Sequence, residues 1–277
     1  MPTPENDVMS AQMIDLPQEP APAALAVAPA WHTLALLAGI LAISIHGASR
    51  FSGAQAPINR LTTYGFTAVM EVGLLAWVLF GLRLGKTSFR SVLGPFSPNI
   101  RSMALDLGIA MAFWFASLMV LGTLGLAWTG VEAAITHHSP LAHVPGQPFT
   151  PDASQQQALR VLAQLAPANR AEIAAWALLC LLVGFSEEVV FRGYLQRQLI
   201  AWARGGVVVG VLLSAAVFGA AHGYQGVRNM VLLGIFGALF SALALVRGSL
   251  RAGIVAHCWH DLIAGLTLAL LKSNHLI

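Results

Sequence analysis

The stretch GFSEEVVFRG, residues 184–193, lies inside a hydrophobic run that covers residues 172–199. A run of this length can cross the ~30 Å hydrocarbon core of a bilayer as a helix. Charged residues make up only 10% of the 277-residue chain, yet this stretch contains Glu187, Glu188 and Arg192. Ionisable groups inside a membrane are costly unless they are paired or hydrated, so they indicate a functional site.

The whole chain has the composition of a polytopic membrane protein. Hydrophobic residues make up 57% of it, well above the share in a soluble domain. We predict an all-α bundle of about seven to eight transmembrane helices, seven of which can be placed on the sequence. These candidate spans cover residues 31–49, 61–82, 103–127, 172–199, 207–227, 229–246 and 252–271.

The hydrophobic pattern divides the chain into four regions. Residues 1–30 carry acidic residues, many Pro and Ala, and no Lys or Arg, which predicts a disordered acidic tail rather than a secretory signal peptide. Residues 31–129 are predicted to be scaffold helices. Residues 130–171 form a polar loop whose second half has apolar residues at helical spacing and could lie along the membrane surface. Residues 172–277 hold most of the ionisable residues of the spans.

The distribution of charge predicts location and partners. The net charge of +3 is spread over the loops, which fits contact with anionic lipid and gives no reason to expect nucleic acid as a partner. The side that holds the N-terminus is the more basic, and this favours a cytoplasmic N-terminus. The short loops rich in Ala and Gly, with no evident targeting peptide, favour a bacterial inner-membrane protein. His137, His138 and His143 are interpreted as residues of a solvated loop rather than metal ligands.

Ionisable residues within the predicted spans are few and clustered. Seven of the nine lie in the last 91 residues, and the full set is Glu71, Asp106, Glu187, Glu188, Arg192, His222, His257, His260 and Asp261. In a helix, Glu188 and Arg192 are four residues apart and can form an ion pair. Glu187 points about 100° away from Glu188, which leaves it available as a general base. The alternative is that all three charged groups form a solvated cluster at the membrane interface.

Two further elements carry histidines at helical spacing. VFGAAHG places Phe218 and His222 four residues apart, and AHCWHDL does the same for His257 and Asp261. A single His in an apolar helix is often a core residue bonded to a backbone carbonyl. Together, however, Glu187, His222, His257 and Asp261 could converge on one water molecule. They could polarise it directly, or Glu187, His222 and His257 could hold a zinc ion. The helical metalloprotease motif HEXXH is absent.

The three motifs resemble those of the CPBP family of intramembrane proteases, which includes the CAAX prenyl endopeptidase and bacteriocin-processing and immunity proteins. The resemblance covers roughly residues 170–272 and implies a helical core with a cavity inside the membrane. It implies that Glu187 activates water and that Glu188 and Arg192 brace Glu187. It also implies that His222 positions the water. His257 and Asp261 would bind the water and stabilise the oxyanion. The third motif often ends in Asn; Asp261 adds a negative charge and cannot donate a hydrogen bond when ionised.

The implied reaction is hydrolysis of a peptide bond in or beside the bilayer, in a peptide or membrane-protein substrate that could be lipidated. Two other interpretations stay open. One is a non-catalytic scaffold or immunity protein of the same family, because a fold does not determine a function. The other is a proton-coupled transporter with Glu71 in its relay, which predicts repeats between the two halves that the sequence does not show. The family motifs do not explain Glu71, which we expect to be protonated or paired with an Arg.

Overall fold

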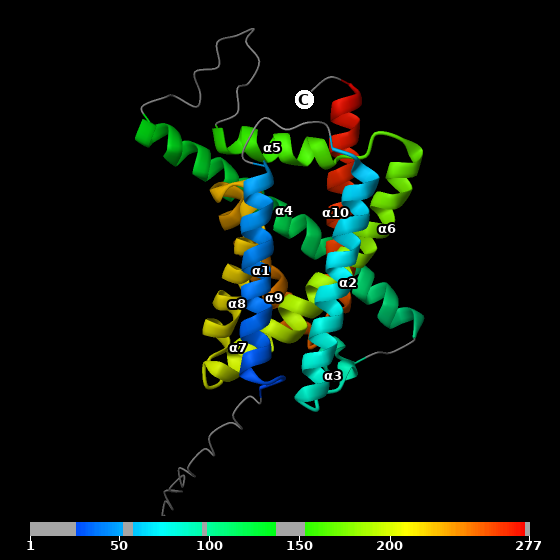
Figure 1. Cartoon of the computed structure of the whole chain (residues 1–277), viewed down its shortest axis with the longest axis vertical. Coiled ribbons are helices and arrows are strands. Elements are labelled where there is room, and N and C mark those ends of the chain that lie inside the picture. Colours follow the sequence, from blue (N-terminus) through cyan, green and yellow to red (C-terminus); the bar gives the residue numbers. More distant parts are fainter. Residues whose placement is uncertain (1–25, 52–57, 96–98, 137–152, 275–277) are drawn as a thin grey trace, which may run out of the picture.

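The computed structural model describes residues 26–51, 58–95, 99–136 and 153–274. These residues form helices and connecting turns without a β-strand, which confirms the predicted all-α class. Most of the predicted acidic tail and the three histidines of the polar loop lie outside the described residues. The elements in chain order are α1 (Ala30–Phe51), α2 (Arg60–Leu84), α3 (Phe89–Leu93), α4 (Ile100–Thr136), α5 (Ala153–Leu165), α6 (Arg170–Glu187), the π-helix η1 (Glu188–Leu195), α7 (Gln196–Trp202), α8 (Val207–Ala221), the 3₁₀ turn η2 (Gly223–Gln225), α9 (Val227–Arg247) and α10 (Arg251–Ser273) (Figure 1).

Six helical segments of the described chain are long and apolar enough to cross a membrane, where seven to eight were predicted. The difference arises at residues 207–227. There α8 is 15 residues long, or about 22 Å, which is short of a ~30 Å hydrocarbon core. Gly223 and Gly226 follow it, and Gly226 has a φ of 90° that other residues rarely adopt. In contrast, α4 extends over 37 residues into the region predicted as a loop.

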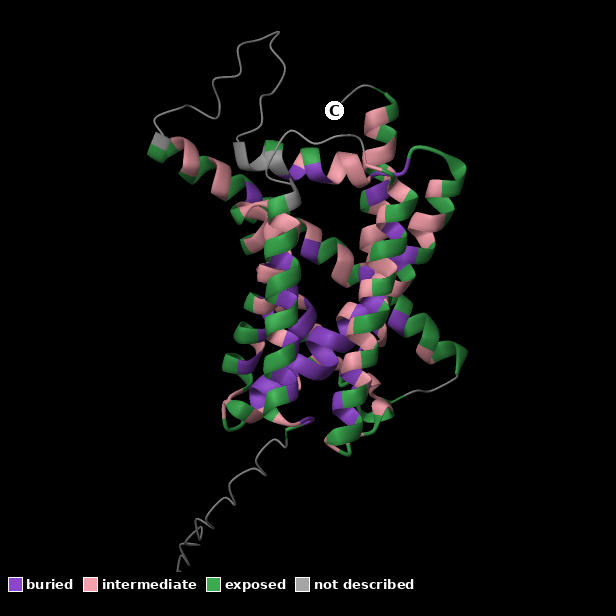
Figure 2. Cartoon of the chain, viewed as in Figure 1, coloured by how far each residue is buried: buried purple, intermediate pink, exposed green. Residues whose placement is uncertain are grey.

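The surface of the bundle is that of an integral membrane protein. Large apolar side chains point outward along α1, α2 and α4, among them Leu41, Phe66, Val69, Phe115 and Met119. Such an exposed apolar surface is unusual for a soluble monomer but is normal where lipid surrounds the protein. Figure 2 shows that buried residues gather instead around η1 and α7, and every residue of η1 is buried. The π-helix is therefore the centre of the bundle.

Helix α5 lies across one end of the bundle, crosswise to α1 and α2 (Figure 1). It packs against α9, α10 and η2. Two of its C-terminal carbonyls are held by α2, because Tyr64 donates to the carbonyl of Leu165 and Arg60 Nε donates to that of Gln164 at 2.8 Å. The second half of the predicted polar loop is thus helical and caps one end of the helical core, and its position along the membrane surface stays a prediction.

Polar contacts fasten the N-terminal helices to this core. Gln198 Oε1 accepts from the backbone N–H of Val27 at 2.8 Å, and Gln198 Nε2 donates to the carbonyl of Ala28 at 2.9 Å. His32 Nε2 donates to the carbonyl of Trp77 and its Nδ1 lies 2.8 Å from the Tyr194 hydroxyl. Buried hydrogen bonds of this kind stabilise helix association where lipid provides no hydrophobic driving force.

Asp106 of α4 forms ion pairs with two arginines. It lies 3.0 Å from Arg247 of α9 and 2.7 Å from Arg251 of α10. Two cations therefore neutralise this carboxylate. Asp106 ties three helices together and is not part of the candidate site.

Candidate active site

The site is built around the junction between α6 and η1, where Glu187 ends the α-helix and Glu188 begins the π-helix. Short π-helical segments often occur at functional sites. Gly184, one turn earlier, allows α10 to approach closely. A Cβ atom there would lie 2.6 Å from Cys258 Sγ and 2.8 Å from the Cys258 backbone nitrogen. This close packing places Glu187 and Glu188 against the neighbouring residue, His257.

Glu188 is the centre of a buried charged network. Its Oε1 lies 2.9 Å from Arg192 Nη1 and 2.9 Å from His257 Nδ1. The i, i+4 contact between Glu188 and Arg192 agrees with the sequence spacing. Arg192 also donates to the carbonyl of Gly237 at 3.3 Å, and its guanidinium carbon lies 4.3 Å from the centre of the Phe218 ring. The contact with Phe218 is a cation–π interaction, and Glu188 and Arg192 are 0% and 2% exposed.

Glu187 points to the other side, as the helical geometry predicts. Its Oε2 lies 3.5 Å from His257 Nε2 and makes no hydrogen bond within the described residues. Asp261, one turn along α10 from His257, places its Oδ2 3.8 Å from the same nitrogen. His257 thus bridges the two glutamates. Because a carboxylate only accepts, Nδ1 donates to Glu188, and Nε2 faces Glu187 and Asp261.

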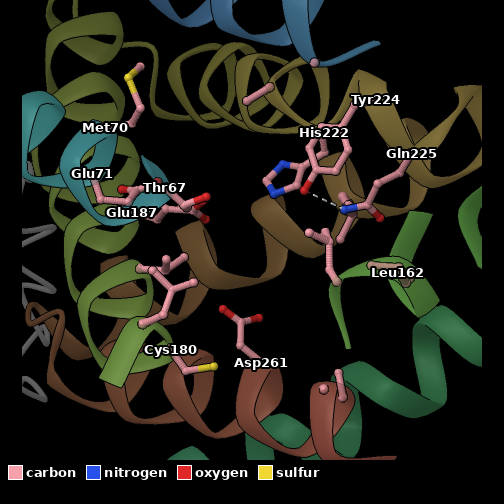
Figure 3. Close-up of a pocket in the computed structure, with 18 of the residues that line it drawn as sticks. Thr67, Met70, Glu71, Leu162, Cys180, Glu187, His222, Tyr224, Gln225 and Asp261 are labelled. Carbon is pink, nitrogen blue, oxygen red and sulfur yellow. Dashed lines mark hydrogen bonds between the residues drawn. The ribbon is translucent and has the colours of Figure 1, made fainter. Parts of the chain in front are cut away.

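His222 reaches the same space from the end of α8. Its Nδ1 donates to the carbonyl of Phe218 at 2.9 Å, the bond expected of a core histidine. This bond orients the ring so that Nε2 is the nitrogen available to the cavity. In Figure 3, His222, Glu187 and Asp261 surround one open space, although they come from α8, α6 and α10. The structure thus brings all four sequence-predicted catalytic candidates together.

That space is a cavity of about 530 Å³, within the usual range for ligand sites. Most of the side chains that line it are apolar. The ionisable ones are His46, Tyr64, Glu71, Cys180, Glu187, His222, Tyr224, His257, His260 and Asp261. Glu188 and Arg192 are not among the lining residues. The two adjacent glutamates therefore belong to different environments, one facing the cavity and one enclosed in protein.

Two cavity residues have no role in the protease interpretation of the sequence. Glu71 of α2 is 8% exposed and accepts a hydrogen bond from Ser186, the residue before Glu187. No ion pair joins it to an Arg within the described chain, contrary to one of the two expectations. Tyr224 of η2 accepts from Gln225 Nε2 at 3.1 Å, and its ring centre is 6.0 Å from that of His222. Glu71 was recognisable as an unexplained acid, whereas nothing in the sequence pointed to Tyr224.

The described residues contain no group of three or more His, Cys, Asp or Glu side chains arranged to hold a metal ion. The set of Glu187, His222 and His257 supplies the oxygen and nitrogen donors that zinc accepts. Within that set, His257 already uses Nδ1 for Glu188 and His222 uses Nδ1 for Phe218. Each retains Nε2, so zinc binding by these residues stays a prediction.

The architecture and the site together define a polytopic integral membrane protein with a carboxylate–histidine centre in a cavity between its helices. Residues 169–263 match the family model described as Type II CAAX prenyl endopeptidase Rce1-like. The matched segment runs from the start of α6 into α10 and contains Glu187, Glu188, Arg192, His222, His257 and Asp261. It confirms the resemblance found in the three motifs for this part of the chain. No curated protein and no solved structure matches the chain.

Proposed function

We propose that the protein is an intramembrane endopeptidase in which Glu187 activates the attacking water. One observation carries this proposal: Glu187 lines the cavity beside His257, whereas Glu188 does not line it and is fully enclosed. A general base must be able to reach a water molecule and the substrate, and only the first of the two glutamates can. The match to a protease family supports the same assignment.

In the proposed reaction, Glu187 takes a proton from water as the water oxygen attacks the scissile carbonyl carbon. A tetrahedral intermediate forms, and its oxygen carries the negative charge. Glu187 then gives the proton to the amide nitrogen as the carbon–nitrogen bond breaks, releasing an amine and a carboxylic acid. His222 Nε2 faces the same space and would help to position the water.

The oxyanion needs hydrogen-bond donors at this position. An ionised Asp261 cannot donate, so its role is to orient His257, 3.8 Å away. We assign the oxyanion to His257 Nε2, when that nitrogen carries a proton, and to the hydroxyl of Tyr224. Figure 3 shows the phenol of Tyr224 directed past His222 toward the open space between Glu187 and Asp261, with Gln225 beside it.

The Glu188–Arg192 pair has a positioning role in this scheme. Glu188 Oε1 receives Arg192 and His257 at the same distance, 2.9 Å. It thereby fixes both the ring orientation and the tautomer of His257, as a carboxylate behind a catalytic histidine commonly does. Phe218 closes the network by packing on the Arg192 guanidinium.

The proposed substrate is a peptide or a segment of a membrane protein, in a form that could be lipidated, and the proposed location is a bacterial inner membrane with a cytoplasmic N-terminus. If zinc binds, Glu187, His222 and His257 would hold it, and it would polarise the water and the scissile carbonyl. The alternative, a non-catalytic scaffold of the same family, has the same fold but requires no turnover.

The test is cleavage of a membrane-tethered peptide library by purified protein in defined lipid, with products identified by mass spectrometry. We expect cleavage by the wild type and none by Glu187→Gln, which keeps the size of the side chain but cannot take a proton. Metal content is measured in the wild type and in Asp261→Asn. If the wild type cleaves no peptide either with or without added zinc, the scaffold interpretation replaces the protease interpretation.

A further inference from the structure

One face of α2 carries a row of polar side chains along the cavity. Thr63, Thr67 and Glu71 follow one another at intervals of four residues, and all three line the cavity. Residues at this spacing lie on the same side of a helix, so the row extends along the α2 wall for about 12 Å. Most of the other lining side chains are apolar. The row lies outside the segment that matches the protease family, and the three motifs do not account for it.

The two hydroxyls of the row can accept hydrogen bonds from a ligand. Thr63 Oγ1 donates to the carbonyl of Asn59 at 3.0 Å, and Thr67 Oγ1 donates to the carbonyl of Thr63 at 3.0 Å. Each hydroxyl thereby uses its single proton on its own helix and retains its acceptor lone pairs. In the part of the chain that the structure describes, no group donates to either hydroxyl oxygen. The row therefore presents two free acceptors to the cavity.

One end of the row lies at the proposed catalytic residue. Glu71 accepts a hydrogen bond from Ser186, the residue before Glu187, and Figure 3 shows Thr67, Glu71 and Glu187 together at one side of the cavity. The other end of the row approaches α5, because Tyr64 of α2 donates to a carbonyl of that helix. The row thus leads from α5 to the place where the scissile bond would lie.

The spacing of the row fits an extended polypeptide. In an extended chain, alternate residues direct their backbone N–H and C=O groups to the same edge, and these groups recur every ~6.6 Å. Thr63 and Thr67 are separated by about 6 Å along the axis of α2. We propose that this face of α2 binds the substrate backbone in extended form, with two alternate N–H groups donating to the hydroxyls of Thr67 and Thr63. Recognition of this kind depends on the backbone of the substrate rather than on its side chains.

The inference rests on the proposed protease function for its register, since that function places the scissile carbonyl beside Glu187. Thr67 is about 6 Å and Thr63 about 12 Å from Glu71 along the helix axis. These distances correspond to about two and about four residues of an extended chain. The N–H groups that contact the row should therefore lie about two and about four residues from the scissile bond, on one side of it.

The experiment removes single N–H groups from one ligand and measures its binding to the full-length protein in defined lipid. The ligand is a decapeptide of Ala and Leu whose central bond is replaced by a non-cleavable hydroxyethylene isostere; its apolar side chains suit the mostly apolar lining. In a series of analogues, each remaining amide in turn is replaced by an ester, which has no N–H. We expect two esters on one side of the isostere, two residues apart, to raise the dissociation constant about three- to tenfold, the usual contribution of one hydrogen bond. The ester between them should have a smaller effect.

Three variants assign the effect to the row. Thr67→Val keeps the shape of the side chain without its hydroxyl, so it should bind the all-amide ligand about three- to tenfold more weakly and lose the effect of one ester. Thr67→Ser restores a hydroxyl and should regain that effect. Thr62→Val makes the same substitution at an exposed position of α2 that does not line the cavity, and it should bind like the wild type. Wild-type affinity and an unchanged ester pattern in Thr67→Val would overturn the inference.

Because the ligand is not cleaved, its binding is measured independently of the proposed chemistry. If the wild type shows the alternating ester pattern but cleaves no peptide of the library, the row is a peptide-binding site and the protease proposal fails. If library peptides are cleaved but the ester series shows no alternation, the protease proposal stands and the inference fails. If the wild type does not bind the isostere, recognition through the backbone is wrong, whatever the result of the cleavage assay.

Discussion

Glu187 and Glu188 are adjacent in the chain, at the α6–η1 junction, but their side chains lie in different environments. On one side, Glu188 is buried with Arg192 and bound to Nδ1 of His257, whose other ring nitrogen faces the cavity side. On the other, Glu187, Asp261 and His222 face a cavity of about 530 Å³. Charge enclosed in protein is stable only when it is paired, as Glu188 is with Arg192, whereas charge on a cavity wall can exchange partners. The first side therefore supports the structure, and the second is free to react.

The largest expected effect tests the cavity side. Glu187→Gln should reduce peptide cleavage by about 10²- to 10⁴-fold, the usual contribution of a general base. Thermal unfolding in detergent should change little, because Glu187 Oε2 makes no hydrogen bond in the described structure. Activity that survives in Glu187→Gln would show that another group activates the water.

The next largest effect tests the enclosed side, and we expect to see it first as a loss of stability. Glu188→Ala leaves Arg192 buried without its carboxylate and removes the acceptor of His257. Removal of one member of a buried ion pair commonly costs about 3–5 kcal/mol. We expect a large decrease in the unfolding temperature together with loss of cleavage. A Glu188→Ala protein that keeps full stability and activity would contradict the bracing role.

A companion variant separates charge from shape on this side. Glu188→Gln retains an oxygen for His257 but gives Arg192 a neutral partner. Its stability should lie between that of the wild type and that of Glu188→Ala. If the two variants are equally destabilised, the negative charge rather than the hydrogen bond holds the network together.

The sequence alone could predict which glutamate pairs with Arg192, because the interactions that decide this are local. The i, i+4 spacing of Glu188 and Arg192, and the 100° turn between adjacent helix residues, determine which glutamate pairs. The bridge from His257 to Glu188 joins residues 69 positions apart, and it depends on the close approach that Gly184 permits. The same limit applies to Glu71, whose partner Ser186 is 115 residues away. Such contacts depend on helix packing, which periodicity does not specify.

The fold, too, could be predicted in part from local features of the sequence. Hydropathy identified the apolar helices, because about 20 apolar residues indicate a span whatever surrounds them. It overestimated residues 207–227, since an apolar sequence continues across Gly223 and Gly226 although the helix ends at Ala221. It also gave no indication of the π-helix at Glu188–Leu195, because α and π segments share the same composition.

Tyr224 offers a smaller effect that sharpens the chemistry of the cavity side. Tyr224→Phe removes one hydroxyl and keeps the ring that packs near His222. If this hydroxyl stabilises the oxyanion, the cleavage rate should fall by about 10²-fold with little change in KM, because the bond strengthens only in the transition state. An increase in KM at unchanged kcat would instead make Tyr224 a residue that binds substrate. Gln225→Glu is a useful partner variant, because it replaces the amide that donates to the phenol.

The smallest effect comes from the charge cluster of Asp106, Arg247 and Arg251, which does not line the cavity. Asp106 joins α4 to Arg247 and Arg251, whose side chains are 31% and 21% exposed. Because the two arginines are partly solvated, their interaction with Asp106 is screened, and Asp106→Asn should lower stability by only about 1 kcal/mol. The variant should cleave substrate at the wild-type rate, which makes it a control for Glu188→Ala: both remove a carboxylate from an arginine, but only one touches His257. Loss of activity in Asp106→Asn at unchanged stability would show that the packing of α4 against α9 and α10 is coupled to the site. The reactive region would then extend beyond the residues that line the cavity.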